Sequence, residues 1–346
     1  MSARARIVEE IAAAGGWVSF ARYMQLALHE PGSGYYASSA RKFGAEGDFV
    51  TAPELGPLFG RTLARALRGF ERIIELGAGS GALAEVLTRE LDCEYWVLET
   101  SAELRHRQRE RLGERVRHLE RLPERLRGAV IANEVLDAMP VHVVHWSESG
   151  ILERGVDAAL RWSERPAAGE LLAAAERISV PVPYVSEIGL LARASMRTLA
   201  QSLEDGVILV IDYGFPRREY YHPQRSSGTL MCHYRHRAHA DPFAHPGEED
   251  ITAHVDFSAL AEAARAGGAS VLGYTSQAQF LVNCGITEVL GEANAANALH
   301  YAPIAAEAQK LLSPAEMGEL FKVLAVGTGD CAALLGFQDG DRRASL

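Results

Sequence analysis

The sequence has few cysteines and no long apolar run. Its four cysteines are scattered and form no Cys-x-x-Cys pair, a pattern expected in a reducing compartment and not in a disulfide-stapled secreted domain. No apolar stretch approaches the roughly 18 residues that cross a bilayer, and the N-terminal residues lack the apolar core of a secretory signal. We therefore expect no membrane insertion and a cytoplasmic protein, or one of the mitochondrial matrix if the source is eukaryotic.

Positive charge is also in deficit. Lysine and arginine total 35 against 45 for aspartate and glutamate, which gives a net charge of -10 over 346 residues. A protein that holds nucleic acid through its phosphates needs a basic surface, so this balance argues against such a partner. A cationic substrate is compatible with it.

Two catalytic motifs are absent. No Gly-Lys-Ser/Thr follows the glycine cluster that begins at Gly77, which excludes a P-loop. No Gly-x-Ser-x-Gly elbow is present, which removes the simplest hydrolase interpretation. The glycine cluster therefore serves another ligand.

From Arg72 onward, apolar segments of strand length alternate with segments of helical periodicity. Strands are expected at "RIIEL", "EYWVLE", "AVIAN" and "GVILVIDYG". Helices are expected at Leu83 to Leu91 and from a Thr100-x-x-Glu103 capping box to Leu112. This alternation predicts an α/β fold with a doubly wound, Rossmann-like and mostly parallel sheet, whose ligands bind beyond the carboxyl ends of the strands.

The chain divides into four parts in this interpretation. Residues 1–70 form a helical segment with a loop that covers the cofactor, and residues 71–150 form the first half of the binding core. Residues 151–205 form an insertion that handles the substrate and ends in a helix from Ile188 to Leu203. Residues 206–346 form the second half of the core, in which "FKVLAVGTG" and "CAALLGF" predict a terminal antiparallel hairpin. The sequence is compatible with a homodimer.

The glycine turn "ELGAGSGA" fits two ligands. Gly77, Gly79 and Ala82 match the dinucleotide fingerprint, and Glu99 lies about twenty residues on, where a ribose-binding acid is expected, so these residues taken alone favour NAD. Glu75 and the additional Gly81 favour another ligand, because a carboxylate beside the turn opposes a pyrophosphate and attracts a cation. S-adenosyl-L-methionine carries a sulfonium and an amino group and no phosphate. The Glu-x-Gly-x-Gly-x-Gly pattern resembles motif I of the class I methyltransferases, in which the acid at Glu99 holds the ribose hydroxyls.

Polar residues end the two strands expected beside the glycine turn. In "VIANEVLDAMPV", Asn133, Glu134 and Asp137 are candidates for handling the substrate, since carboxylates match the fork of donors on a guanidinium. Alternatively, Asp137 caps a following helix and only Glu134 meets the ligand. Asp212 ends the next strand at the same rim, as a catalytic candidate or as the cap of a turn.

The segment "CHYRHRAH" contains the residue types of a metal site. Two features oppose zinc, namely the lack of paired ligand spacing and the positive charge of the interleaved arginines, so we expect no metal. His236 is the candidate proton acceptor, because imidazole titrates near neutral pH. Asp256, further on, is the expected N-cap of a helix that runs to Ala266.

Several blocks together resemble one family. "GSGYYASSARKFGAEGDFVTAPELG", "IIELGAGSGALAEVL", "ANEVLDAMPV", "VIDYG" and "GTLMCHYRHRAHADPFAHPGEEDITAHVDF" are similar to the MidA family, bacterial relatives of a mitochondrial arginine methyltransferase needed for respiratory complex I assembly. The resemblance runs from about Phe20 to Gly285. It implies S-adenosyl-L-methionine as cofactor and, as substrate, a protein arginine, specifically on a complex I subunit. The residues that it implies for the cofactor are Glu75, Gly77, Gly79, Gly81 and Glu99, with Asp48 closing over it and Asn133 at the strand end.

The leading hypothesis is thus a protein arginine methyltransferase that depends on S-adenosyl-L-methionine, with Glu134 orienting the guanidinium. Three alternatives stay open at the level of the sequence. They are an NAD-binding oxidoreductase, a small-molecule methyltransferase, and an assembly factor that binds without catalysing a reaction.

Overall fold

The computed structural model describes residues 2–37, 51–294, 297–329 and 334–346. Its main sheet has the strand order β15-β16-β10-β5-β2-β3-β4, with β14 beside β10. The strands are β2 (Arg72–Leu76), β3 (Glu94–Leu98), β4 (Arg117–Leu119), β5 (Leu126–Asn133), β10 (Leu203–Phe215), β14 (Val255–Asp256), β15 (Ser270–Ser276) and β16 (Phe321–Thr328). The four strand predictions made from Arg72 onward all fall within this sheet.

The pairing is mostly parallel, with antiparallel strands at one side. Strands β4, β3, β2, β5 and β10 pair in parallel, whereas β16 lies antiparallel between β10 and β15. The predicted α/β fold with antiparallel terminal strands is confirmed. The predicted hairpin partner of β16 is wrong in its described part, because residues 334–337 form a turn and irregular structure, while residues 331–333 lie outside the described ranges.

The apolar character of that segment has another cause. Both edges of β16 are already occupied, by β10 and by β15, so no edge is left for a further strand. Instead, Phe337 packs against Phe280 with ring centroids 5.4 Å apart and joins the core beside the sheet. The apolar residues of this segment therefore indicate burial and not a strand.

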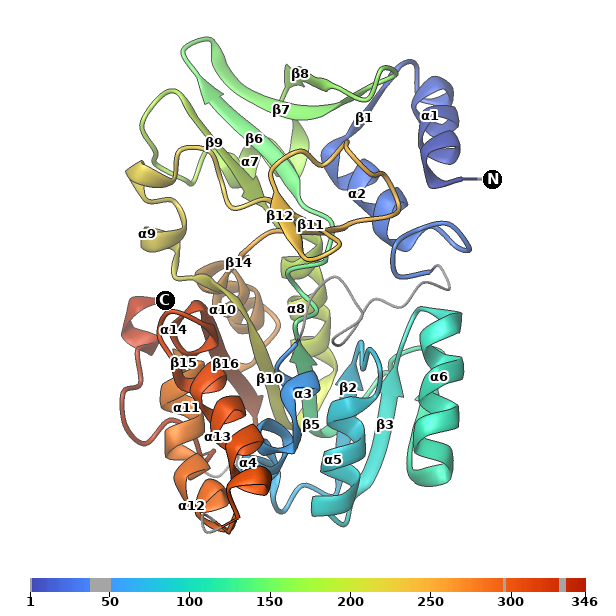
Figure 1. The fold of residues 1–346 in the computed structure, drawn as a ribbon. Coiled ribbons are helices and arrows are strands. Elements are labelled where there is room, and N and C mark those ends of the chain that lie inside the picture. The colour runs from blue at the N-terminus through green and yellow to red at the C-terminus, as the bar shows by residue number, and fades with distance from the viewer. Residues whose placement is uncertain (1, 38–50, 295–296, 330–333) are drawn as a thin grey trace.

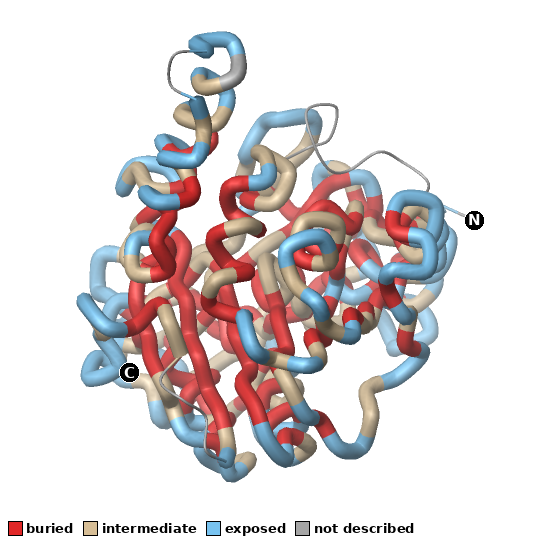
Figure 2. The backbone as a smooth tube through the Cα atoms, turned by 90° about the horizontal axis from the view of Figure 1, so that it is seen from below, coloured by how far each residue is buried: buried red, intermediate tan, exposed pale blue. Residues whose placement is uncertain are grey.

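Helices cover both faces of the main sheet (Figure 1). One buried cluster joins one face to α4 (Pro57–Leu67), α5 (Ala82–Glu90), α11 (Gln277–Asn283), α12 (Ile286–Gly291) and α13 (Ala298–Leu312). A second joins the other face to α8 (Leu190–Ser202) and α10 (Phe257–Ala266). Figure 2 shows the consequence, with buried residues along the strands and exposed residues on the outer turns.

Two helix starts were predicted from caps. Asp256 accepts a hydrogen bond from the backbone N–H of Ala259 at 3.0 Å, which confirms it as the N-cap of α10. The cap at Thr100 is wrong: α6 (Ala102–Leu112) begins one residue later, and Ser101 accepts from the N–H of Leu104 at 3.3 Å. The hydroxyl of Ser101 also donates to the carbonyl of Tyr36 at 2.7 Å, a long-range contact that no local pattern shows.

A second, five-stranded antiparallel sheet lies apart from the main one, in the upper part of Figure 1. Its strands are β1 (Trp17–Ser19), β6 (His142–Ser147), β7 (Gly150–Asp157), β8 (Trp162–Pro166) and β9 (Tyr184–Ile188). It therefore begins before residue 150, takes one strand from the N-terminal segment and is followed by α8, which packs on the main sheet. The sheet is backed by α1 (Ala3–Ala13), α2 (Phe20–His29) and α7 (Gly169–Ala175).

A third, small sheet of order β12-β11-β13 lies between these two parts. Its strands are β11 (Met231–Tyr234), β12 (Arg237–His239) and β13 (Asp250–Thr252), and the short helices nearby are α3 (Ala52–Leu55), α9 (Arg217–Tyr220) and α14 (Met317–Leu320). In the described part of the chain, no helix combines the length and the apolar character needed to span a membrane.

Candidate functional site

A cavity of about 550 Å³ lies at the carboxyl ends of β2, β3, β5 and β10. The glycine turn and the acids around it form one half. The polypeptide after β5, with residues from α2, β11 and β13, forms the other half. This is the rim at which an open α/β sheet binds its ligands.

The glycine turn connects β2 to α5 in a conformation that side chains disfavour. Gly77, Gly79 and Gly81 have φ of 61°, 55° and 81°, in the left-handed region where glycine carries no steric cost. Gly77 and Gly79 line the cavity. Gly81, which was also predicted to bind the cofactor, does not line the cavity. It is the N-cap residue of α5 and shapes the turn.

Two buried carboxylates flank this turn. Glu75 accepts a hydrogen bond from the Tyr95 hydroxyl at 2.8 Å, and burial raises the pKa of Glu75 to about 7. Glu99 accepts from the N–H of Ser101 at 2.9 Å, and burial raises its pKa as well. Two acids at the turn would repel a pyrophosphate, whereas a ligand with cationic groups and ribose hydroxyls satisfies both. The residues present thus fit S-adenosyl-L-methionine.

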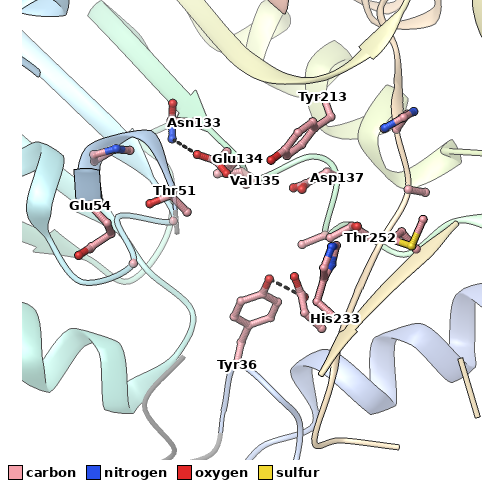
Figure 3. Close-up of a pocket in the computed structure, with 18 of the residues that line it drawn as sticks. Tyr36, Thr51, Glu54, Asn133, Glu134, Val135, Asp137, Tyr213, His233 and Thr252 are labelled. Carbon is pink, nitrogen blue, oxygen red and sulfur yellow. Dashed lines mark hydrogen bonds between the residues drawn. The ribbon is translucent and has the colours of Figure 1, made fainter. Parts of the chain in front are cut away.

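The end of β5 and the residue after it present Asn133 and Glu134 to the cavity (Figure 3). Glu134 has φ of 53°, an uncommon conformation for a residue with a side chain and one that recurs at functional sites. Its carboxylate accepts from the N–H of Ala52 at 3.2 Å and from the Asn133 amide at 3.3 Å. Burial and then the charge of Asp212 raise the pKa of Glu134, to about 8.

Asp137 lies in the same wall and no helix follows it, so the alternative role as a helix cap does not hold. Its side chain is 6% exposed, and its Oδ1 has no hydrogen-bond partner in the described structure. Burial, with the charges of Asp212, Asp250 and Glu134, raises the pKa of Asp137 well above its usual range. An unpartnered buried carboxylate oxygen beside a cavity is suited to a cationic donor.

Asp212 is placed behind this wall and does not line the cavity. It is fully buried, and its Oδ2 accepts from the N–H groups of Val135 and Leu136 at 3.2 and 2.9 Å. Asp212 therefore holds the turn that presents Glu134 and Asp137, and its carboxylate does not face the cavity as predicted.

His236 is also placed away from the cavity. It lies at the exposed turn between β11 and β12 and has φ of 62°. His233 and His254 line the cavity instead. In a strand, alternate side chains face opposite sides, so with Cys232 buried in the core His233 faces away from it. If the bounds of β11 had been known, His233 would have been favoured over His236 as the histidine that faces the cavity.

Two predictions remain, the role of Asp48 and the candidate zinc ligands. Asp48 lies outside the described residues. Of the four residues considered for zinc, Cys232 lies in the core and pairs with His239 across the hairpin, His233 lines the cavity, and His236 lies at the exposed turn. No metal-binding group of three or more His, Cys, Asp or Glu side chains occurs among the described residues.

Sequence reasoning gave no site role to the residues that line the far wall. Tyr36 donates to Asp250 Oδ1 at 2.8 Å, and both residues line the cavity. Figure 3 shows Tyr36 across the cavity from Glu134 and Asp137, with Tyr213 beside those two acids. Tyr36 belongs to the aromatic loop "GSGYY", whose aromatics in a polar segment were the available signal.

The lining is strongly acidic. It contains one arginine, Arg225, among its described residues, and six carboxylates, Glu54, Glu75, Glu99, Glu134, Asp137 and Asp250. Glu54, Glu75 and Glu99 lie in the half around the glycine turn, called the cofactor half below. Glu134, Asp137 and Asp250 lie in the other half, called the substrate half. Both halves therefore attract positive charge.

A family model described as "Putative S-adenosyl-L-methionine-dependent methyltransferase" matches residues 58–275. The chain belongs to this family. S-adenosyl-L-methionine is accordingly the cofactor of this methyltransferase, which confirms the prediction drawn from Glu75 and the glycine turn and removes NAD.

Individual relatives agree with the family. The methyltransferase is 29% identical over 380 residues to the mitochondrial protein arginine methyltransferase NDUFAF7 homolog of Drosophila melanogaster, across 92% of this chain and 84% of that protein. It is 27% identical over 367 residues to human NDUFAF7, across 90% and 80%. A crystal structure from Burkholderia thailandensis with bound S-adenosyl-homocysteine is 49% identical, with a TM-score of 0.95 over 99% of this chain and 96% of that one. The resemblance to the MidA family and its mitochondrial relatives is confirmed.

Proposed function

We propose that this methyltransferase acts on an arginine of a protein substrate. The observation that carries the proposal is the group of three carboxylates, Glu134, Asp137 and Asp250, in the half of the cavity beyond the glycine turn. A guanidinium is permanently charged and offers donors in a fixed fork, which carboxylates match better than any neutral group does. The relatives named as protein arginine methyltransferases support the same substrate class.

The chain's own residues provide binding, orientation and proton acceptance. When bound, S-adenosyl-L-methionine supplies an electrophilic methyl group on a sulfonium. Glu75 and Glu99 would hold its cationic and ribose groups. Glu134 and Asp137 would orient the guanidinium, so that one nitrogen faces that methyl group, and take up the proton that the nitrogen releases. Asp212 fixes the turn that carries them.

Electrostatics make the substrate half selective for a cation. Burial raises the pKa of Glu134 to about 8, so this carboxyl group is mostly protonated at neutral pH unless a cation lies beside it. A guanidinium beside it favours the charged form and lowers that pKa. A neutral substrate can hydrogen-bond this group but lacks the charge attraction.

We further propose that the substrate is a subunit of respiratory complex I, as the resemblance to the mitochondrial arginine methyltransferase implies. Mass spectrometry of complex I subunits from cells with and without this protein tests it. A methylated arginine that disappears in the deletion strain, and returns with the wild-type gene but not with Glu134→Gln, is the expected result. An unchanged methylation pattern would contradict the complex I substrate, and transfer to a small amine alone would contradict the protein substrate.

A further inference from the structure

The region 151–205 contributes no side chain to the cavity. All of its residues are described and none of them lines the substrate half, although the sequence predicted that this region handles the substrate. One of its residues contacts the cavity wall from behind. Glu187, in β9 of the second sheet, is 1% exposed, so it is a buried carboxyl group that the proposed mechanism does not use.

Glu187 holds a segment that forms one wall of the substrate half. Its Oε1 accepts from the N–H groups of Thr229 and Leu230, both at 3.1 Å, and its Oε2 accepts from the Thr229 hydroxyl at 3.0 Å. Gly228, Thr229 and Leu230 all line the cavity. A Cβ on Gly228 would overlap the Glu187 carboxylate, so the segment needs glycine there to approach this closely. The carboxylate therefore fixes the position of this wall.

The Thr229 hydroxyl extends this anchor to His254. A carboxylate only accepts and the backbone N–H of His254 only donates, so the hydroxyl donates to Glu187 and accepts from His254, at 3.0 Å in each case. At the preceding residue, the N–H of Ala253 donates to the Asp137 carbonyl at 3.0 Å. The backbone at His254 is therefore held between Glu187 and the segment that carries the substrate-half acid Asp137.

His254 belongs to the substrate half. It lines the cavity, and its ring stacks on Tyr213 with centroids 6.1 Å apart and an interplanar angle of 22°. Its Nδ1 is buried and has no hydrogen-bond partner in the described structure. Burial and then the charges of Arg225 and Lys322 lower the pKa of His254 to about 4, so the ring is neutral at neutral pH. A neutral imidazole has one acceptor nitrogen for an N–H group and does not repel a guanidinium.

We propose that Glu187 is a positioning residue for methyl transfer, which through Thr229 holds His254 where its ring contacts the target arginine. The inference rests on the proposed protein arginine substrate. The hydrogen bonds of Glu187 within the described ranges go to its own strand and to residues 220–230, and none goes to the cofactor half. Loss of the anchor should therefore change arginine binding and leave cofactor binding intact.

Glu307 provides a matched control for Glu187. It is also buried, at 4% exposure, and accepts from the N–H groups of two consecutive residues, Leu58 and Phe59, at 2.8 and 3.2 Å. A Cβ on Gly56 would likewise overlap its carboxylate. Leu58 and Phe59 do not line the cavity. Glu307→Gln therefore weakens the same kind of anchor at a place that the substrate does not contact.

The test uses the full-length protein with either Glu187→Gln or Glu307→Gln. The probes are two labelled decapeptides that differ only at a central position, which is arginine in one and citrulline, its neutral isostere, in the other. Peptide binding is measured by fluorescence anisotropy with S-adenosyl-homocysteine present, and cofactor affinity by calorimetry. Methyl transfer to the arginine peptide gives KM and kcat separately. Hydrogen exchange of residues 228–230 and 254 measures the anchor itself.

Both variants should have a lower melting temperature, because each leaves buried N–H groups without a charged acceptor. Only Glu187→Gln should reduce the preference for arginine over citrulline, by about fivefold or more, and raise KM for the arginine peptide, with cofactor affinity unchanged. Faster exchange at residues 228–230 and 254 should accompany this loss. An arginine preference that Glu187→Gln keeps, or that Glu307→Gln loses equally, would overturn the proposal.

Thr229→Val tests the same link in a protein that keeps the buried carboxylate, which matters if Glu187→Gln does not fold. The variant retains the backbone N–H groups that donate to Glu187 and removes the hydroxyl that joins Glu187 to His254. Thr229→Ser keeps that hydroxyl, so it should retain more of the arginine preference and a lower KM than Thr229→Val. Equal values in these two variants would also overturn the proposal.

The wild type separates this inference from the proposed function. If the wild type shows no preference for arginine over citrulline and transfers no methyl group to arginine, the arginine substrate is contradicted, together with the role of Glu187 that rests on it. If the wild type prefers and methylates the arginine peptide and Glu187→Gln does so equally well, arginine methylation stands and only the role of Glu187 is contradicted.

Discussion

The two halves of the cavity are built in different ways. The cofactor half comes mainly from one continuous stretch, β2, the glycine turn and the start of α5, with Glu99 added just after the neighbouring β3 and Glu54 from α3. The substrate half is assembled from five segments, which contribute Tyr36, Glu134 with Asp137, Tyr213, His233 and Asp250. The first half depends on local backbone geometry, and the second depends on how distant segments pack. Substitutions in the cofactor half should therefore change the affinity for S-adenosyl-L-methionine, and substitutions in the substrate half should change the rate of methyl transfer.

Gly77→Val should have the largest effect, on the cofactor half. A Cβ at this position would lie 3.1 Å from Cγ2 of Val135, and a β-branched residue at φ of 61° is strained. We expect affinity for S-adenosyl-L-methionine to fall about a hundredfold, measured by calorimetry. Gly69→Val is the matched control, since Gly69 also has positive φ, 97°, but no atom within 4 Å of its Cβ position. Equal losses in both variants would mean that the effect is general strain.

Glu134→Gln should affect the substrate half alone. The amide keeps an oxygen that accepts from the N–H of Ala52 but loses the charge that a guanidinium requires. We expect kcat to fall about ten- to hundredfold with cofactor affinity unchanged. Glu124→Gln, at an exposed position before β5, serves as control. Full activity of Glu134→Gln would remove this carboxylate from the mechanism.

The pH dependence of cofactor binding should report on Glu75. Its pKa is raised to about 7 by burial, so the protonated form stabilises the fold at low pH, and this contribution is lost as pH rises from the usual carboxyl range through 7. A cationic ligand prefers the ionised form, so affinity should rise by about tenfold between pH 5.5 and pH 7. Titration calorimetry across this range measures it. Glu75→Gln should give weaker binding with a flat profile, and an equally steep profile in that variant would assign the dependence to another group.

The smallest expected effect concerns the cap of α6. Ser101→Ala removes the cap and the hydrogen bond to the Tyr36 carbonyl, and should lower the free energy of unfolding by about 1 kcal/mol or slightly more. Thr100→Ala at the neighbouring exposed position should change it by less than about 0.5 kcal/mol. Urea denaturation of both variants distinguishes them. The reverse order would restore Thr100 as the cap.

The fold and the cofactor half could be predicted from the sequence because their signals are local. Apolar strands, helical periodicity and the acid beside the glycines each lie within one short segment. The second strand of the terminal hairpin was mistaken because apolarity alone does not distinguish a strand from a loop packed on the core, as Phe337 shows. The cap was misplaced by one residue because Thr100 and Ser101 both suit the position.

The substrate half depended on contacts between distant segments. His233 and His236 lie three residues apart in one motif, and only the bounds of β11 decide which faces the cavity. Asp212 carries a candidate catalytic side chain in the sequence, yet it turns toward the N–H groups of Val135 and Leu136. Neither outcome follows from residue types.

The sequence by itself determined the α/β sheet, the glycine turn and the preference for a cationic cofactor without phosphate. Hydrophobic periodicity and left-handed glycines act over a few residues, so their physical consequences can be read from the order of residues alone. Only the tertiary structure decided which carboxylates share the substrate half and that Asp212 supports the wall behind them. Burial, and the pKa shifts that burial causes, arise when segments far apart in the chain exclude water together.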